Sequence, residues 1–183
     1  MLSDEELIAT YQRSRSDEVA DELVSRHIGR IRGFVFQMVL NDAAADDVTQ
    51  EIFLRAFRAL GSFKGHSQFS TWLYRIALNT TRTYIARQTR SPVECHAEVP
   101  GDGPVTDRTP DESILDTEMM GEIEAALAEL SPSLRAAIVL TSLQGLDVQE
   151  AADMEGCTRA TMYWRIHKAR KLLTQKLDGY LSM

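Results

Sequence analysis

Apolar residues in the first half of the chain recur at every third or fourth position, which is the spacing of an amphipathic α-helix. Such stripes run through residues 19–40, 44–60 and 71–87. Asn41 offers an N-cap between the first two stripes, and Gly61 follows the second, where a glycine commonly ends a helix. No run of useful length alternates apolar and polar residues, so the pattern predicts helices without a sheet.

Shorter helices with tight turns are predicted nearer the C-terminus. A Ser-Pro pair, typical of a helix start, opens a helix over 132–143. The capping-box pattern DVQE opens a helix over 148–154, and Gly156 supplies a turn before a final helix over 159–178. A short helix, a turn with a glycine and a longer helix together predict a helix-turn-helix.

The stretch SPVECHAEVPGDGPVTDRTPDESILDTEMMG, residues 91–121, separates these two helical regions. It contains four of the five prolines and has no periodic apolar pattern, as expected of a flexible linker. The expected fold is therefore all-α, with two small helical domains over residues 1–90 and 122–183 joined by a flexible acidic linker.

Composition places the chain among globular proteins. It has 183 residues, 44% of them hydrophobic, and its longest apolar stretch, FVFQMVL, is too short to span a bilayer. The acidic start MLSDEELIAT does not resemble a signal peptide. Cys95 and Cys157 form no pairing pattern, so we expect a reduced, cytoplasmic protein.

The formal net charge of −7 is unevenly distributed, because residues 91–121 alone carry a net charge of −7. Two windows contain bases and no acid. The bases of the first window are Arg55, Arg58, Lys64, Arg75, Arg82, Arg87 and Arg90. Those of the second are Arg159, Arg165, Lys168, Arg170, Lys171 and Lys176. Two basic surfaces suggest a polyanion contacted at two places, although two solvated helix faces would look similar.

The final helix has an unusual outer face. With Met162, Ile166 and Ala169 directed inward, the outward residues include two aromatic side chains, an imidazole and two lysines: Tyr163, Trp164, His167, Lys168 and Lys171. Such a face suits a helix in the DNA major groove, where cations meet phosphates or guanine and apolar edges meet thymine methyls. Alternatively, Trp164 packs back on a neighbouring helix.

The segment from residue 62 to residue 82 has a similar two-faced character. A loop of small and polar residues precedes a helix face that carries Trp72, Arg75, Asn79 and Arg82. Aromatic rings that stack on bases, an amide that reads a base edge and arginines that bind phosphates favour single-stranded nucleic acid. The alternative is that Phe69 and Trp72 are core residues.

A third surface, on helix 44–60, has a different chemistry. Asp47, Gln50, Glu51, Leu54 and Arg58 share one face of this helix. Two carboxylates would repel DNA, so the face suits a basic protein partner, although solvated helix surfaces often look like this.

Three features together resemble an extracytoplasmic-function (ECF) sigma factor of the sigma-70-like family, reduced to regions 2 and 4. They are the segment ADDVTQEIFLRAFRALGSFKGHSQFSTWLYRIALN, the acidic proline-rich linker and the C-terminal RIHKARKLL. The resemblance implies that residues 1–90 bind core RNA polymerase and the minus-ten element, and that 122–183 read the minus-thirty-five element. It also implies an anti-sigma factor, often membrane-anchored in this family, that sequesters the protein at the inner membrane.

The resemblance assigns a role to each surface. The face of Asp47 to Arg58 docks on the clamp helices of the polymerase, and Phe63 and Asn79 hold a flipped base. The full minus-ten surface is Phe63, Lys64, His66, Ser67, Phe69, Trp72, Arg75, Asn79 and Arg82. The helix-turn-helix also touches the polymerase flap, and it contacts duplex DNA through Arg159, Thr161, Tyr163, Trp164, Arg165, His167, Lys168 and Lys171.

The final helix departs from the family pattern at two places. Tyr163 and Trp164 stand where a basic and a small residue are common, and His167-Lys168 replaces the usual histidine and arginine. An unusual distal promoter element or a hydrophobic contact to protein would both account for this.

Two other classes of function remain to be weighed. A stand-alone helix-turn-helix regulator with an N-terminal sensing domain would leave the basic window at 62–90 unexplained. Against an enzyme, the histidines show no metal-ligand spacing, no glycine-rich phosphate loop is present, and no serine or cysteine has an evident base. Cys95-His96 is a weak metal motif, so no metal, cofactor or small-molecule substrate is expected.

Overall fold

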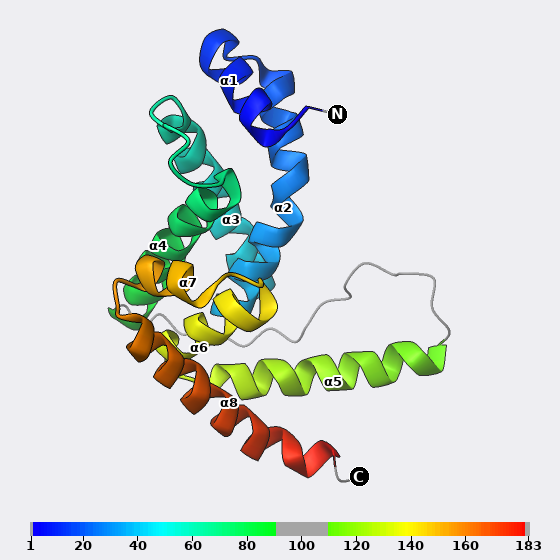
Figure 1. Ribbon diagram of the computed structural model, residues 1–183. Helices are drawn as coiled ribbons and strands as arrows, with labels where there is room; N and C mark the ends of the chain where they lie inside the picture. The colour runs from blue at the N-terminus through cyan, green and yellow to red at the C-terminus, as the bar shows by residue number, and fades with distance from the viewer. Residues whose placement is uncertain (1, 91–109, 182–183) are drawn as a thin grey trace. The chain divides into compact units, whose positions relative to one another are not determined.

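A computed structural model describes the backbone of residues 2–90 and 110–181, and the side chains of residues 2–90 and 119–177. Its contacts divide the chain into two compact units, Met1–Ser91 and Pro92–Met183, which we call unit 1 and unit 2. Helices and connecting loops, without a strand, make up the described residues (Figure 1). The predicted fold class, all-α with two helical domains, is confirmed.

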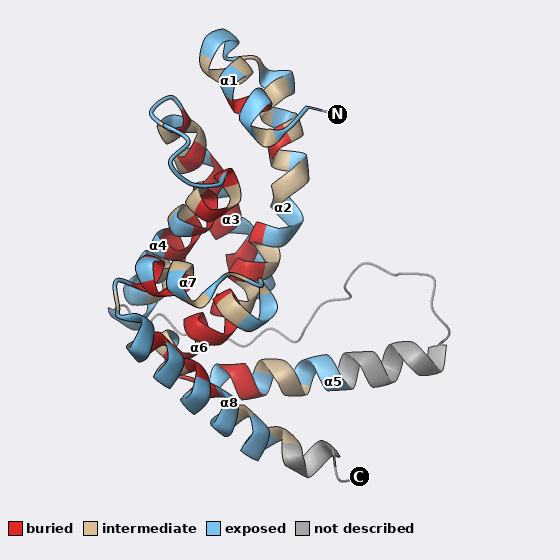
Figure 2. Cartoon of the chain, viewed as in Figure 1, coloured by how far each residue is buried: buried red, intermediate tan, exposed pale blue. Residues whose placement is uncertain are grey.

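Unit 1 has four helices: α1 (Asp4–Ser14), α2 (Asp17–Val39), α3 (Asp42–Leu60) and α4 (Phe69–Arg90). The last three match the three predicted stripes within two to three residues at each end. Their apolar faces meet in one core, visible as the buried sides of these helices in Figure 2. Its most buried large side chains are Leu23, Ile31, Phe34, Met38, Ile52, Leu60, Leu73 and Leu78.

Helix α1 was not among the predicted helices. Its N-terminus is a complete capping box, in which the Glu6 backbone N–H donates to Ser3 Oγ at 3.2 Å and the Ser3 N–H donates to Glu6 Oε2 at 2.7 Å. Leu7 and Ile8 are buried against the rest of unit 1. The sequence signal for this helix was therefore the Ser-x-x-Glu pattern, because one short apolar pair is too little for a periodicity argument.

Unit 2 contains α5 (Pro110–Ala128), α6 (Pro132–Ile138), the π-helical turn η1 (Val139–Leu143), α7 (Val148–Glu155) and α8 (Arg159–Leu181). Gly156 has a φ of +62° and lets the chain turn sharply between α7 and α8, as a helix-turn-helix requires. Leu140, Met162 and Ala169 are fully buried between α6, η1 and α8.

Helix α5 begins at Pro110, within the stretch 91–121 that was predicted to be a linker. Proline at the first helical position and acidic residues in the first turn both favour a helix start, and this signal was overlooked. Residues 91–109, including Cys95 and His96, lie outside the described residues. None of the described helices is long and apolar enough to cross a membrane.

Candidate nucleic-acid interface and partner-binding face

An aromatic cluster lies where the loop after α3 meets the start of α4. The centroid of the Phe63 ring is 5.1 Å from that of Trp72, and the Phe69 centroid is 5.6 Å from Trp72 and 6.1 Å from Phe63. Phe63 and Trp72 are half-buried, so part of each ring faces solvent. Partly exposed rings held against each other can offer a stacking surface to a base without first collapsing inward.

Phe69 has a different place in this cluster from the one predicted. Its side chain is only 5% exposed, because it lies beneath Phe63 and Trp72 and its ring also meets the edge of His27 at 5.1 Å. The prediction that Phe69 contacts DNA is therefore wrong, and the core alternative holds for this residue. Trp72 combines the two alternatives, since it packs on Phe69 and keeps part of its surface exposed.

Polar and basic residues surround the cluster. Lys64, His66 and Ser67 are exposed in the loop, in which Gly65 makes a turn with a φ of +71°. On α4, Arg75 and Asn79 are exposed one helical turn apart, and Arg82 is half-buried on the same side of the helix. The structure thus brings together the partly exposed rings, the Asn79 amide and cations of the predicted minus-ten surface.

The second candidate surface is a groove between α2 and α3. Asp47, Gln50 and Arg58 are exposed, Glu51 is half-buried, and Leu54 keeps 48% of its surface in contact with solvent. Beside Leu54 lies an apolar groove of about 520 Å³, lined by side chains of both helices. The lining includes Val24, Ile28, Asp47, Gln50, Phe53, Leu54 and Phe57.

Val24, Ile28 and Phe57 were missing from the predicted partner-binding face. Ile28 is 43% exposed, although it stands between the buried residues Leu23 and Ile31 in the sequence. The signal was present as a second apolar pair, Val24 and Ile28, spaced four residues apart beside the core stripe. Their position opposite Leu54 depends on how α2 packs on α3, which periodicity does not give.

The charges on this face are held in place by ion pairs. Arg55 Nε donates to Glu51 Oε1 at 2.6 Å. This hydrogen bond is the main cause that lowers the pKa of the Glu51 carboxyl group; burial opposes it, and the charges of Arg55, Arg58 and Arg87 each lower the pKa by a smaller amount. Glu51 therefore remains ionised at neutral pH and presents a fixed negative charge to a partner.

The third candidate surface is the N-terminal half of α8. Tyr163 and Trp164 are 50% and 57% exposed, which confirms their predicted outward position and excludes the packing of Trp164 on a neighbouring helix within unit 2. Arg159 lies over the Tyr163 ring with its guanidinium carbon 5.5 Å from the centroid, and Lys168 Nζ lies 4.9 Å above the Trp164 centroid. The pairs hold cations beside exposed rings.

The other predicted residues of α8 divide into two groups. His167, Lys168 and Lys171 are exposed. Thr161 is half-buried, and its N–H donates at 3.1 Å to Oγ1 of Thr158, the residue that caps the helix start. Arg165 is different, because its Nη1 donates to Glu155 Oε2 at 2.7 Å and the Glu155 side chain is fully buried. This ion pair links α7 to α8, so the structure corrects the prediction of Arg165 as a DNA contact.

Comparison with known proteins adds an independent observation. The family model described as Sigma-70 region 2 matches residues 23–91, and the one described as Sigma-70, region 4 matches residues 120–173. The RNA polymerase sigma-H factor of Pseudomonas aeruginosa is 31% identical over 97% of this chain and 95% of its own. The ECF RNA polymerase sigma-E factor of Haemophilus influenzae is 32% identical over 97% of this chain and 96% of its own.

A solved structure shows the same fold. The sigma factor RpoE of Bartonella quintana, in complex with the anti-sigma factor NepR, aligns with a TM-score of 0.69 and 22% sequence identity. The alignment covers 86% of this chain and 96% of that one.

Proposed function

The chain belongs to the ECF sigma factors of the sigma-70 family, and on this premise we propose a role for each of its three exposed surfaces. As an alternative sigma factor it is a non-catalytic subunit of RNA polymerase, which binds the core enzyme and promoter DNA and is regulated by an anti-sigma factor.

The loop of residues 62–68 and the exposed face of α4 bind the non-template strand of the minus-ten element. The observation that carries this proposal is the partly exposed pair Phe63 and Trp72, with Asn79 exposed about two helical turns farther along α4, on a stretch without any acidic residue. A base that leaves the duplex stacks on the rings, while the Asn79 amide is free to read its edge. Arg75 and Arg82 attract the phosphates that flank this base.

The groove between α2 and α3 binds the clamp helices of core RNA polymerase. Leu54 and Ile28 provide the apolar centre of this contact, and Asp47, Glu51 and Arg58 provide a charged rim that excludes wrong partners. An anti-sigma factor inhibits the protein by covering the same groove. We further propose that the protein acts in the cytoplasm and that its inhibitor holds it at the inner membrane.

The exposed face of α8 binds the minus-thirty-five element as intact duplex. Tyr163 and Trp164 provide apolar edges for thymine methyl groups, and their paired cations Arg159 and Lys168 reach the phosphates on either side. Unit 2 also contacts the polymerase flap while α8 occupies the groove.

The test of this function is transcription in a reconstituted system. Core RNA polymerase with the chain is expected to produce run-off transcripts from a small set of promoters in a genomic fragment library, whereas core polymerase alone produces none. Failure of the chain to associate with core polymerase at low salt would refute the proposal. Tight, sequence-specific duplex binding by the isolated chain would instead favour a stand-alone regulator.

In the same assay, Asn79→Ala is expected to lower initiation from a cognate promoter by about five- to 150-fold, because base-edge hydrogen bonds contribute about 1–3 kcal/mol. Gln88→Ala, which removes another exposed amide from α4, is the matched control and should leave initiation unchanged. Permanganate reactivity of unpaired thymines checks that the loss arises at promoter opening. Equal transcription by the Asn79 variant and the wild type would remove the base-reading role.

Lys168→Ala tests the contact of α8 with phosphate. The affinity constant K for DNA falls as salt rises. If Lys168 neutralises one phosphate, its loss makes the negative slope of log K against log salt concentration shallower by about one unit. Promoter binding should weaken by a similar factor on every sequence. The measurement is holoenzyme affinity for duplex promoter DNA across a salt series, with Lys176→Ala as the control, because Lys176 pairs with Glu129 at 2.5 Å. An unchanged slope would count against a phosphate contact.

A further inference from the structure

The loop of residues 62–68 is held at its start by a side chain from helix α1. Gln12 Nε2 donates to the carbonyl oxygen of Leu60 at 2.9 Å and to that of Phe63 at 3.0 Å. The first carbonyl belongs to the last turn of α3, and the second belongs to the aromatic residue of the proposed base-binding surface. One half-buried amide therefore joins the end of a helix to the first turn of the loop.

Two neighbours of Gln12 support the same junction. The Tyr11 ring lies 5.4 Å from the ring of Phe57 on α3, which fastens this face of α1 to the helix before the loop. Arg15, which follows α1, lies over Gly61 so closely that a Cβ atom at residue 61 would be 2.7 Å from its Nη2. Helix α1 thus approaches the entry of the loop along one side.

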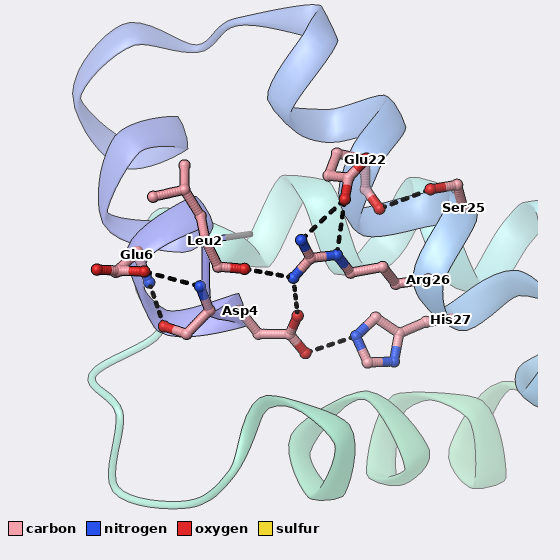
Figure 3. Close-up of polar contacts among 8 residues, drawn as sticks. Leu2, Asp4, Glu6, Glu22, Ser25, Arg26 and His27 are labelled. Carbon is pink, nitrogen blue, oxygen red and sulfur yellow. Dashed lines mark hydrogen bonds and ion pairs between the residues drawn. The ribbon is translucent and has the colours of Figure 1, made fainter.

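The other end of α1 is linked to the exit of the loop indirectly, through His27 of α2. Asp4 Oδ2 lies 2.7 Å from His27 Nε2, and Asp4 Oδ1 accepts from Arg26 Nη1 at 3.1 Å (Figure 3). Arg26 is also bonded to Glu22, so this corner of α2 is fixed from two directions. The His27 ring also makes a T-shaped contact with the ring of Phe69, the buried residue that packs against Phe63 and Trp72.

These contacts start from a helix outside the segment matched by the region 2 model, which begins at residue 23. A loop that includes a glycine with a positive φ and several exposed residues has few buried contacts of its own. The position of Phe63 therefore depends on partners outside the loop: its ring packs on Trp72 and Phe69, and its backbone carbonyl accepts from Gln12.

We propose that helix α1 positions the 62–68 loop for DNA, with Gln12 fixing its entry and the Asp4–His27 pair supporting its exit through Phe69. In this arrangement Gln12, Asp4 and His27 are positioning residues that do not touch the nucleic acid. The inference rests on the proposed role of the loop in minus-ten recognition.

Gln12→Met tests the proposal, because methionine keeps most of the side-chain volume and removes both donors. Holoenzyme with this variant is expected to bind a single-stranded minus-ten oligonucleotide about tenfold more weakly, as when one or two hydrogen bonds are lost. Arg13→Ala is the matched control on the same helix, because Arg13 is exposed and its Nε donates only along α1, to Ala9. Affinity for core polymerase should be equal for all three proteins.

A second measurement separates positioning from general stabilisation. The chain contains two tryptophans, so in a Trp164→Phe background the fluorescence comes from Trp72, whose ring is 5.1 Å from that of Phe63. Gln12→Met should increase acrylamide quenching of Trp72 in the full chain far below its unfolding temperature. A helix that only stabilised the fold would leave this quenching unchanged in the folded state.

The outcomes are distinguishable. If wild-type holoenzyme does not bind the oligonucleotide, the proposed function of the loop fails. If the wild type binds and Gln12→Met binds equally with unchanged quenching, the function stands and the positioning role is overturned. Should Gln12→Met not fold, Asp4→Ala is measured in the same way. This variant removes the contact with His27 and leaves the hydrogen bond between Arg26 and Glu22 in place. Equal oligonucleotide binding by Asp4→Ala and the wild type would also overturn the proposal.

Discussion

Replacing Arg165 with alanine is expected to lower the free energy of unfolding of unit 2 by about 3 kcal/mol, the cost of removing one partner of a buried ion pair. The partner is Glu155, whose side chain is fully buried and whose Oε2 accepts from Arg165 Nη1 at 2.7 Å. The Arg165 side chain is only 20% exposed, so solvent screens the pair weakly. Urea denaturation followed by circular dichroism measures the effect.

Two controls test whether the loss of stability arises from the broken ion pair. Arg170→Ala removes an exposed arginine from the same helix and should change the free energy of unfolding by less than about 0.5 kcal/mol. The double replacement of Arg165 by methionine and Glu155 by leucine removes both charges and should recover most of the loss. A stable Arg165→Ala protein with weakened binding to duplex promoter DNA would return Arg165 to the DNA-binding residues.

Leu54→Asp is expected to weaken the binding of core RNA polymerase by about 30-fold or more, equivalent to the roughly 2 kcal/mol of an interface hot spot. Leu54 is 48% exposed at the apolar groove between α2 and α3, so an aspartate there leaves the fold intact. In the complex the new carboxylate would lose its water and face apolar surface, which is unfavourable without a partner. Fluorescence anisotropy of labelled chain with core polymerase measures the affinity.

The matched control is Ala9→Asp, which places the same charge at an exposed position of α1, a helix that contributes no residue to the groove lining. It should bind core polymerase as the wild type does. If Leu54→Asp also binds normally, the groove is not the polymerase contact, and the apolar surface at Ile28 and Leu54 needs another partner.

The sequence was sufficient to predict the elements that have a long stripe of apolar residues at helical spacing or a clear helix-ending residue. Helices α2, α3 and α4 each bury several residues at regular spacing, and Gly156 marks the turn of the helix-turn-helix. The burial of Phe69 could have been predicted from the same periodicity, because Phe69 precedes the buried Leu73 by four residues and so lies on the inward face of α4. Its aromatic chemistry was given more weight than its position.

Other features depend on contacts between elements distant in sequence. Arg165 flanks the buried stripe of α8, and only the packing of α7 shows that Glu155 is its partner. In the same way, the bonds of Gln12 to Leu60 and Phe63 join residues about 50 positions apart. Periodicity within one helix contains no information about such pairs, because the spacing that creates them is set by the tertiary structure.

The π-helical turn η1 limits the positions at which unit 2 can be joined to a segment of a related protein in a chimera. In this turn the Gln144 N–H bonds to the Val139 carbonyl at 2.9 Å, five residues back, whereas an α-helix spans four. Each residue of an α-helix rotates the chain by about 100°. Loss or gain of one residue in η1 would therefore change the direction in which α7 and α8 leave this turn. A chimera that exchanges promoter preference with a relative should therefore be spliced beyond Leu146, with the wide turn retained from this chain.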